Sequence, residues 1–207
     1  MVIDHTLIKY PNEIARNNGA YHYSREIVKY FIPNIKTDRN WITIRVGELC
    51  LDHSIYFIHN NLNPDRYDFI KKYNDVILVC GIPETCEKVA HLGRTIYLPL
   101  SVDVAEVASH KSKVRNGTCY AGRQSKRLRM DFSRVRCVEN MKRSKFLREM
   151  GRYEKVYAVG RTAIEAKVLG CEVLPYDERF PDPSVWKVLD SRDAAKILQE
   201  KLNELEG

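Results

Sequence analysis

The stretch Val156-Tyr-Ala-Val-Gly-Arg-Thr-Ala-Ile-Glu-Ala-Lys-Val-Leu-Gly-Cys-Glu-Val-Leu-Pro175 carries the pattern that decides the fold. A short apolar run stops at Gly160, a helical pattern follows, and that pattern ends at Gly170 before a second apolar run begins. Glycine directly after a helical pattern is a C-cap signal. Thr162, with Glu165 three residues later, predicts a capping box at the start of the helix. The stretch therefore predicts a strand–helix–strand unit with parallel strands.

The same alternation extends over most of the chain. Short apolar runs predict strands at 41–46, 54–59, 75–80, 94–99, 117–121, 134–138, 155–159 and 171–174. Helical patterns lie at 21–31, 65–72, 83–92, 143–150, 161–169 and 191–205. Several strand runs are continuously apolar, as in strands buried on both faces of a sheet. Strand–helix alternation of this kind predicts an α/β fold with mostly parallel sheets.

Two such series are separated by the polar and basic segment 104–116. We therefore expect a first domain at 1–102, a second domain at 103–190, and an amphipathic C-terminal helix at 191–207 that packs on either of them. A weak echo supports two similar halves: residues 92–99 and 169–175 both contain a helix end, a glycine, a strand and then Leu-Pro.

The overall composition limits the class of protein. The chain has 207 residues, of which 44% are hydrophobic and 29% are charged, close to the averages for globular proteins. Disorder, a collagen-like chain and a disulfide-dense miniprotein are therefore excluded. No apolar run reaches the roughly 18 residues that a spanning helix needs, so we expect no membrane span. The N-terminus shows no basic segment followed by an apolar run, so we expect no signal peptide.

Six cysteines are present, but their positions argue against disulfides. The sequence contains no Cys-x-x-Cys pair and no Cys/His cluster with zinc-finger spacing. Cys80, Cys119 and Cys137 lie in or beside strand-like runs, where a free thiol acts as a small hydrophobic group. We expect buried thiols, a cytoplasmic location and no metal site.

The formal charge of the chain is +7, and basic residues are concentrated in one segment. Residues 111–129 contain seven basic side chains and no acidic one. Such a segment is either a solvated basic surface or a site for phosphates, which would belong to a nucleotide or to a nucleic-acid backbone. Charge alone does not choose between these alternatives.

Four motifs, taken in chain order, resemble those of one enzyme family. They are a Gly-containing first loop before a helix (residues 18–20), a strand that ends in Pro before a Val-Asp pair (97–103), a strand that ends in Gly-Arg with a lysine soon after (120–126), and a Glu-Ala helix that ends in a Gly-containing turn (165–173). Together with the strand and helix at 75–93, this set is similar to the glycosyltransferases of the GT-B fold. The resemblance spans about residues 17–177.

The resemblance implies two facing Rossmann-like domains, here reduced in size, that bind a nucleotide-sugar. Arg123 and Lys126 would neutralise the diphosphate as its bond to the sugar breaks. Glu165 would accept hydrogen bonds from the ribose hydroxyls. The donor-binding set would also include the backbone around Gly19, Gly122, Gly160 and Thr162. No tightly bound cofactor or metal is implied.

Two further side chains are candidate general bases. His59 ends a strand-like run and is able to contact a sugar or accept a proton. Asp103 lies in the segment between the two halves and is a second candidate. A loop histidine bonded to the backbone and a turn aspartate are the alternative interpretations of these two residues.

Three functions follow from these observations. The first is a glycosyltransferase-like protein that, if active, transfers a sugar to an unknown acceptor. The second is a non-catalytic protein that binds a nucleotide or a partner on a degenerate GT-B scaffold, an alternative favoured by the short chain and by Tyr157, which stands where many retaining members carry a second glutamate. The third is a nucleic-acid-binding protein that uses residues 111–129.

Overall fold

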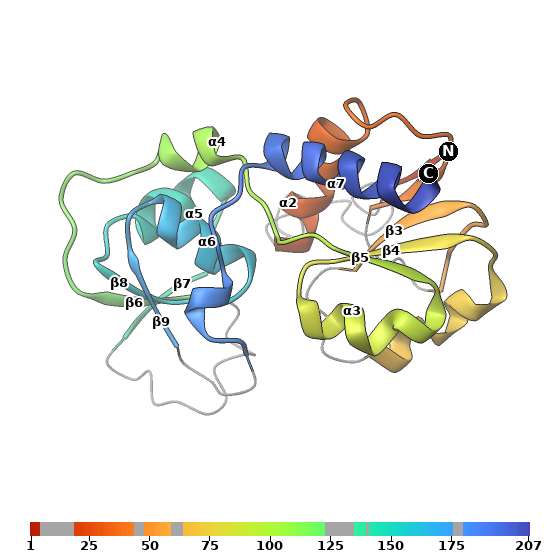
Figure 1. Ribbon diagram of the computed structural model, residues 1–207. Coiled ribbons are helices and arrows are strands. Elements are labelled where there is room, and N and C mark those ends of the chain that lie inside the picture. Colours follow the sequence, from red (N-terminus) through yellow and green to blue (C-terminus); the bar gives the residue numbers. More distant parts are fainter. Residues whose placement is uncertain (5–18, 44–47, 59–63, 123–134, 140, 176–179) are drawn as a thin grey trace. The chain divides into compact units, whose positions relative to one another are not determined.

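The computed structural model describes residues 1–4, 19–43, 48–58, 64–122, 135–139, 141–175 and 180–207. The chain divides into two compact units (Figure 1). Unit 1 comprises Met1–Leu100 together with Ser191–Gly207, and unit 2 comprises Ser101–Asp190. The expected domain boundary, after residue 102, lies two residues past this division. The C-terminal helix belongs to unit 1, so unit 2 is an insertion between two parts of unit 1.

Unit 1 is built on a sheet of five parallel strands in the order β1-β2-β3-β4-β5. The strands are β1 (Val2–Ile3), β2 (Asn40–Ile42), β3 (Ser54–Ile58), β4 (Val76–Cys80) and β5 (Arg94–Tyr97). Every residue of β3 and β4 is buried, which explains their continuously apolar sequences. The predicted α/β class with parallel sheets is thus confirmed for this unit.

Helices cover both faces of the unit 1 sheet. One set consists of α2 (Gly19–Glu26), the π-helical turn Ile27–Phe31 that continues it, and α7 (Ser191–Glu206). The other set consists of the 3-10 helix Pro64–Lys72, α3 (Pro83–Val89) and the 3-10 turn Ala90–Leu92. Figure 1 shows α2 and α7 on one side of β3–β5 and α3 on the other.

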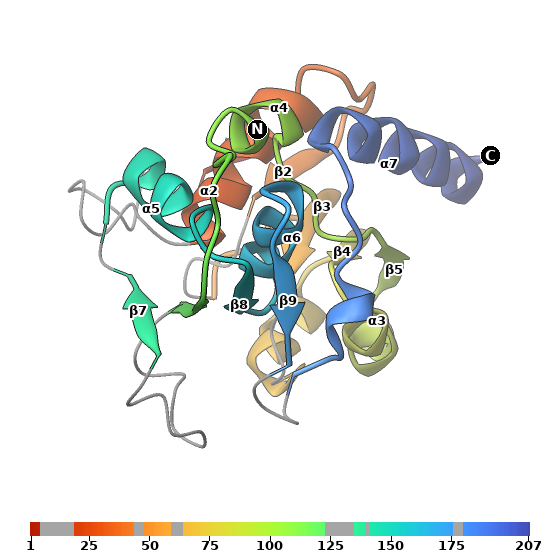
Figure 2. The same ribbon diagram turned by 90° about the vertical axis from the view of Figure 1, so that its left-hand side faces the viewer.

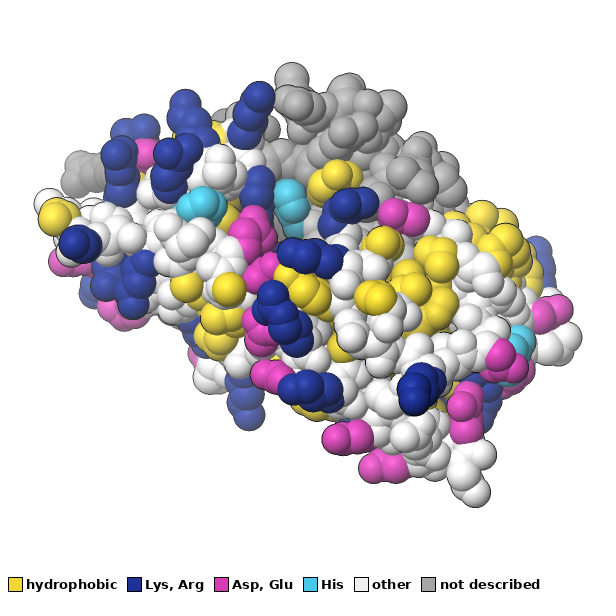
Figure 3. Space-filling view, turned by 90° about the horizontal axis from the view of Figure 1, so that it is seen from above, with side chains coloured by type: hydrophobic (Ala, Val, Ile, Leu, Met, Phe, Trp, Pro, Cys, Tyr) yellow, Lys and Arg dark blue, Asp and Glu magenta, His cyan; other side chains and the backbone are white. Residues whose placement is uncertain are grey.

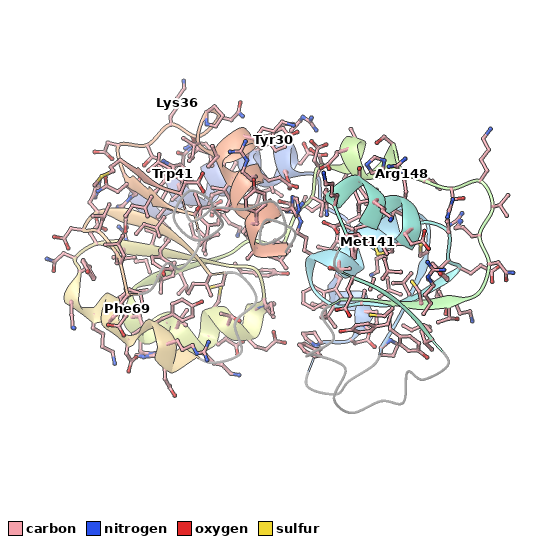
Figure 4. All side chains as sticks on the ribbon, turned by 180° about the vertical axis from the view of Figure 1, so that it is seen from behind. Tyr30, Lys36, Trp41, Phe69, Met141 and Arg148 are labelled. Carbon is pink, nitrogen blue, oxygen red and sulfur yellow. The ribbon has the colours of Figure 1, made fainter. Side chains whose placement is uncertain are left out.

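Two neighbouring residues of β3 pack their side chains against opposite helical layers. Phe57 contacts the rings of Tyr23, Phe31 and Trp41 on the α2 side. Tyr56 points the opposite way, as alternate strand residues must, and contacts Tyr67 and Phe69 of the 3-10 helix. Figure 4 labels Trp41 and Phe69 on the two sides of the sheet. The unit therefore has a double-sided aromatic core.

Unit 2 is built on a four-stranded parallel sheet in the order β7-β6-β8-β9 (Figure 2). Its strands are β6 (Thr118–Ala121), β7 (Arg136–Val138), β8 (Lys155–Tyr157) and β9 (Glu172–Leu174), and its helices are α4 (Val104–Ala108), α5 (Arg143–Met150), α6 (Arg161–Val168) and the 3-10 turn Pro183–Val185. The chain runs from β6 to β7 on one side and then returns to β8 on the other. In open α/β sheets, ligands bind where the direction reverses in this way, beyond the carboxyl ends of the strands.

Two local expectations need correction. Residues 104–108 lie in the polar and basic segment for which no helix was expected, but they form helix α4. Asp103 caps this helix: its Oδ1 atom accepts a hydrogen bond from the Glu106 amide at 3.0 Å. The predicted capping box of α6 is wrong. The N-cap residue is Gly160 and no side chain caps the helix, which places Thr162 inside its first turn.

The cysteines are all free thiols, as predicted. Cys50, Cys80, Cys119 and Cys171 are buried, and burial raises the pKa of the Cys119 thiol above its ordinary value. In the part of the chain that the structure describes, no helix has the length and apolar character needed to cross a membrane.

Candidate functional site

The carboxyl edge of the unit 2 sheet brings together two of the expected donor-binding glycines. Tyr120 of β6 pairs with Tyr157 of β8, so the residues that follow these strands lie at the same edge of the sheet. Gly122 follows β6 by one residue and Gly160 precedes α6 directly. Both glycines therefore lie at the reversal of strand order, where an α/β sheet offers its ligand site.

Gly122 is required by the residue two positions before it. A Cβ atom at Gly122 would lie 2.8 Å from the Tyr120 hydroxyl and 3.1 Å from the Tyr120 Cζ atom. The Tyr120 side chain is fully buried and is packed among Val135, Cys137 and other apolar groups. The ring cannot move aside without disturbing this cluster, so only a residue without a Cβ atom fits here.

Gly160 sets the direction in which α6 begins. Its φ of 60° lies in the region that glycine adopts without strain, and its carbonyl accepts hydrogen bonds from the amides of Ala163 and Ile164 at 3.0 and 3.3 Å. The first amides of a helix have no intrahelical acceptor and lie at the positive end of its dipole. The start of α6, including Thr162, thus presents an environment suited to an anion at the carboxyl edge.

Two arginines and a glutamate meet beside this helix start. Glu165 is 2% exposed, and its Oε1 atom accepts hydrogen bonds from Arg143 Nη1 at 2.7 Å and from Arg161 Nε at 2.9 Å. Burial alone raises the pKa of the Glu165 carboxyl, but the charges of Arg143 and Arg161 outweigh it and the pKa lies below its ordinary value. Glu106 of α4 approaches Arg143 Nε at 3.5 Å. We call these four residues the arginine–glutamate cluster.

The cluster places cationic donors at the carboxyl edge. Arg143 and Arg161 are the first residues of α5 and α6, the two helices that follow β7 and β8. The Arg143 Nη2 atom is buried and has no hydrogen-bond partner among the described residues. Guanidinium groups held in place by a carboxylate are good partners for phosphate oxygens.

The sequence interpretation did not identify these two arginines. Each arginine is the first residue of a helix that was predicted to follow a strand. That position could have indicated a cation at the carboxyl edge of the sheet. Glu165 was identified, but for a role towards ribose. In the structure its carboxylate orients Arg143 and Arg161, and the ribose contact stays a prediction.

The other expected site residues are distributed as follows. Arg123, Lys126 and His59 lie outside the described residues. Gly19 is the first residue of α2 in unit 1. Asp103 is 5% exposed and serves as the cap of α4.

Part of the basic segment 111–129 has a structural task. The Arg115 Nη1 atom donates hydrogen bonds to the carbonyl groups of Leu169, at 3.3 Å, and of Gly170. These carbonyls lie at the C-terminal end of helix α6. The last carbonyl groups of a helix have no intrahelical donor, so the Arg115 guanidinium supplies one. Arg115 therefore stabilises unit 2 itself, at the end of α6 opposite to the candidate site.

Within the described ranges, no group of three or more His, Cys, Asp or Glu side chains is arranged to hold a metal ion. Comparison of this chain with protein-family models, with curated proteins and with solved structures found no match.

Proposed function

We propose that unit 2 binds the diphosphate of a nucleotide-sugar at the carboxyl edge of its sheet, and that the protein transfers the sugar to an acceptor. The observation that carries this proposal is the reversal of strand order between β6 and β8, with glycines at both strand ends and two arginines at the adjoining helix starts. Because unit 1 is also a parallel α/β unit, the proposal includes a reduced GT-B arrangement of two Rossmann-like halves.

The proposed reaction is a transfer in which the phosphate group leaves. The bond between the anomeric carbon and the phosphate oxygen breaks, and the nucleoside diphosphate departs with the bonding electron pair. An acceptor hydroxyl forms the new bond to the anomeric carbon and gives its proton to a base. Arg123 and Lys126 would stabilise the departing charge, and Arg143 and Arg161 at the carboxyl edge would add to this stabilisation.

Of the two candidate bases, His59 is preferred. Asp103 already caps α4, and its Oδ1 atom is bonded to the Glu106 amide. An uncapped α4 would lose stability, so the structure gives Asp103 a reason to be present without any catalytic role. Histidine is the side chain that most often acts as a general base, which favours His59 for this role.

Binding is tested first, by thermal shift and calorimetry with nucleoside diphosphates and nucleotide-sugars. A ligand at about 100 times its Kd should add about 2.7 kcal/mol to the free energy of unfolding. Arg123→Ala should weaken binding at least about tenfold, the loss expected for a charged hydrogen bond. Lys113→Ala is the matched control, because Lys113 is an exposed residue of the same basic segment on the amino side of β6.

Transfer is tested separately, by the release of nucleoside diphosphate from the donor that binds. Release that requires an acceptor, and that is lost in Arg123→Ala but not in Lys113→Ala, supports the transferase. Binding without release supports the non-catalytic alternative. The proposal fails if no nucleotide binds, or if both variants bind as the parent protein does.

A further inference from the structure

The positive charge of the protein resides entirely in one unit. Unit 2 contains 19 Lys and Arg residues against 12 Asp and Glu, which gives +7, whereas unit 1 contains 15 of each. Figure 3 shows many Lys and Arg side chains on unit 2, at the left of that view. A neutral unit joined to a strongly basic one indicates a surface that meets a polyanion, because net charge on its own brings no benefit to folding.

The exposed basic side chains of α5 and of its two ends lie on one face of the helix, whereas Arg143 points towards Glu165. Lys142, Lys145, Arg148 and Arg152 recur every three or four residues and are all exposed. Residues with this spacing are neighbours on a helix surface. The helical turn extends to the last of them, because the Arg152 amide donates a hydrogen bond to the Glu149 carbonyl at 3.2 Å. Figure 4 labels Arg148 on α5.

Arg136 of β7 widens this face at its edge. The Glu149 carboxylate binds Arg136 Nη2 at 3.1 Å and Arg152 Nη1 at 3.2 Å, and so holds the two guanidinium groups beside each other. Both arginines remain well exposed, at 63% and 69%, whereas Glu149 is only 14% exposed. The single acidic group in this set is thus covered while its cationic partners face the solvent. We call Arg136, Lys145, Arg148 and Arg152 the α5 basic face.

The opposite side of α5 excludes a lipid-binding role. Leu147 and Met150, the large apolar residues of its buried side, are fully enclosed in the core of unit 2. A helix that lies in a membrane interface must offer such residues to the lipid. The α5 basic face is formed by charged side chains, which is the kind of surface that binds a phosphodiester backbone.

The dimensions agree with this partner. Lys145 and Arg152 are seven residues apart, or about 10 Å along a helix axis. Phosphates along one strand of a duplex follow each other at about 3.4 Å of axial rise, so the face spans about three of them. Three of its four cations are arginines, which bind phosphate oxygens in pairs.

We propose that the α5 basic face binds the phosphodiester backbone of nucleic acid. This inference is independent of the proposed nucleotide-sugar site, which lies at the carboxyl edge of the sheet and contains none of these four residues. It also differs from the assignment of nucleic-acid binding to residues 111–129, because Arg115 of that segment is bonded to the end of α6.

The test measures fluorescence anisotropy of a short duplex DNA and a single-stranded RNA with the full chain, as a function of salt. One contact for each of the four cations, three along α5 and one at Arg136, predicts that log Kobs falls with log salt with a slope of about −3.6 for the duplex and about −2.8 for the single strand. The two arms thereby identify which nucleic acid is preferred. Vesicles with anionic lipid and polyglutamate are the competing polyanions.

The decisive variant is Lys145→Glu with Arg148→Glu. It should weaken binding at least about tenfold at moderate salt and make the slope shallower by about 2. The matched control is Lys71→Glu with Lys88→Glu, two exposed lysines of unit 1 whose reversal changes the total charge equally. Glu149→Gln should strengthen binding severalfold, because it removes the negative charge that is paired with Arg136 and Arg152.

Thermal melting of each variant shows that it is folded before its affinity is interpreted. The proposal is overturned if neither oligonucleotide binds with the expected salt dependence. It is equally overturned if both double variants lose affinity alike, since net charge alone would then explain binding. Equal affinity for vesicles or polyglutamate would also overturn it, because the face would then not distinguish nucleic acid from other polyanions.

Discussion

His53 and Asp75 occupy equivalent positions immediately before neighbouring strands, and both have left-handed backbones. Ser54 pairs with Val76 at the start of β3 and β4, which places His53 opposite Asp75. Their φ angles are 50° and 54°, and His53 Nδ1 lies 2.6 Å from Asp75 Oδ2. Non-glycine residues adopt such backbone angles at a cost, so their side-chain bonds must offset it.

The same carboxylate connects the sheet with the C-terminal helix. Asp75 also binds Arg94 and the Nη2 atom of Arg39, the latter at 3.0 Å. Arg39 is 4% exposed, and its Nε atom binds Glu206 of α7 at 2.6 Å. Together these groups hold the end of α7 to the amino edge of the unit 1 sheet.

Asp75→Asn should destabilise the protein at neutral pH. Asparagine keeps the size of the side chain and tolerates the left-handed backbone, but it removes the charge that Arg39 and Arg94 share. Because Arg39 is buried while Asp75 is partly exposed, we expect a loss of about 1–3 kcal/mol, below the full cost of breaking a buried pair. Urea unfolding measures the effect, and Asp68→Asn, which changes an exposed carboxylate paired with Lys71, should have a much smaller effect.

This loss should depend on pH in one direction. The bonds from His53, Arg39 and Arg94 outweigh burial and hold the pKa of Asp75 well below its ordinary value. The stabilisation is therefore present above the ordinary carboxyl pKa and is lost as the pH falls towards the folded value. The parent protein and Asp75→Asn should converge in acid; a constant difference at all pH values would contradict the network.

The imidazole of His53 predicts a second pH dependence, at higher pH. Hydrogen bonds to Asp38, at 3.0 Å from Nε2, and to Asp75 raise the pKa of His53 above its ordinary value. Protonated His53 thus contributes stability that is complete below its unfolded pKa, about 6.5, and is lost as the pH rises through the folded pKa. His53→Asn should flatten this part of the stability profile. NMR titration of the ring gives the folded pKa directly, and a value at or below the ordinary one would refute the prediction.

Glu165→Gln should be one of the most destabilising conservative changes in unit 2. It leaves the guanidinium groups of Arg143 and Arg161 beside a neutral amide in a buried site. Removal of one partner from a buried ion cluster costs about 3–5 kcal/mol. Glu106→Gln is the control. The Glu106 side chain is 43% exposed and its contact with Arg143 is long, at 3.5 Å, so the loss of its charge should cost less than about 1 kcal/mol. Chemical unfolding that gives equal values for the two variants would show that the cluster is not a buried unit.

Gly122→Ala should destabilise unit 2 by about 1–3 kcal/mol, the usual cost of inserting a methyl group where no space exists. The clash is specific, because the nearest atom is the Tyr120 hydroxyl oxygen at 2.8 Å. Tyr120→Phe removes that atom and should recover part of the loss. A double-mutant cycle measures this coupling, and strictly additive values would mean that the two residues do not meet.

The regular elements were predictable because their signals are local. Helix 143–150 and the strand cores of β3 and β4 follow from apolar patterns that need no partner elsewhere in the sequence. Strand β1 has two residues and α4 has five, which is too short for a periodic pattern to emerge. The start of α6 was misassigned because Thr162 and Glu165 fit a capping box, whereas Glu165 is engaged by two arginines.

The candidate site was predictable only in part, for a related reason. Gly122 and Gly160 could be identified from the sequence, since glycine at a strand end indicates a tight turn. Arg143 meets Glu165 across 22 residues, and that meeting depends on how β7 and β8 are placed in the sheet. Strand order, which also defines the reversal between β6 and β8, is a property of the folded sheet and not of any single segment.

The insertion of unit 2 into unit 1 has a consequence for the order in which the chain folds during synthesis. Unit 2 is continuous, from Ser101 to Asp190, so all of it has left the ribosome before any of Ser191–Gly207 appears. Unit 1 begins first but needs α7, whose buried residues, among them Leu198 and Leu202, complete its core. We therefore expect the middle of the chain to reach its native state first. Until α7 is made, unit 1 remains incompletely folded, and a chaperone or a protease can recognise it in that form.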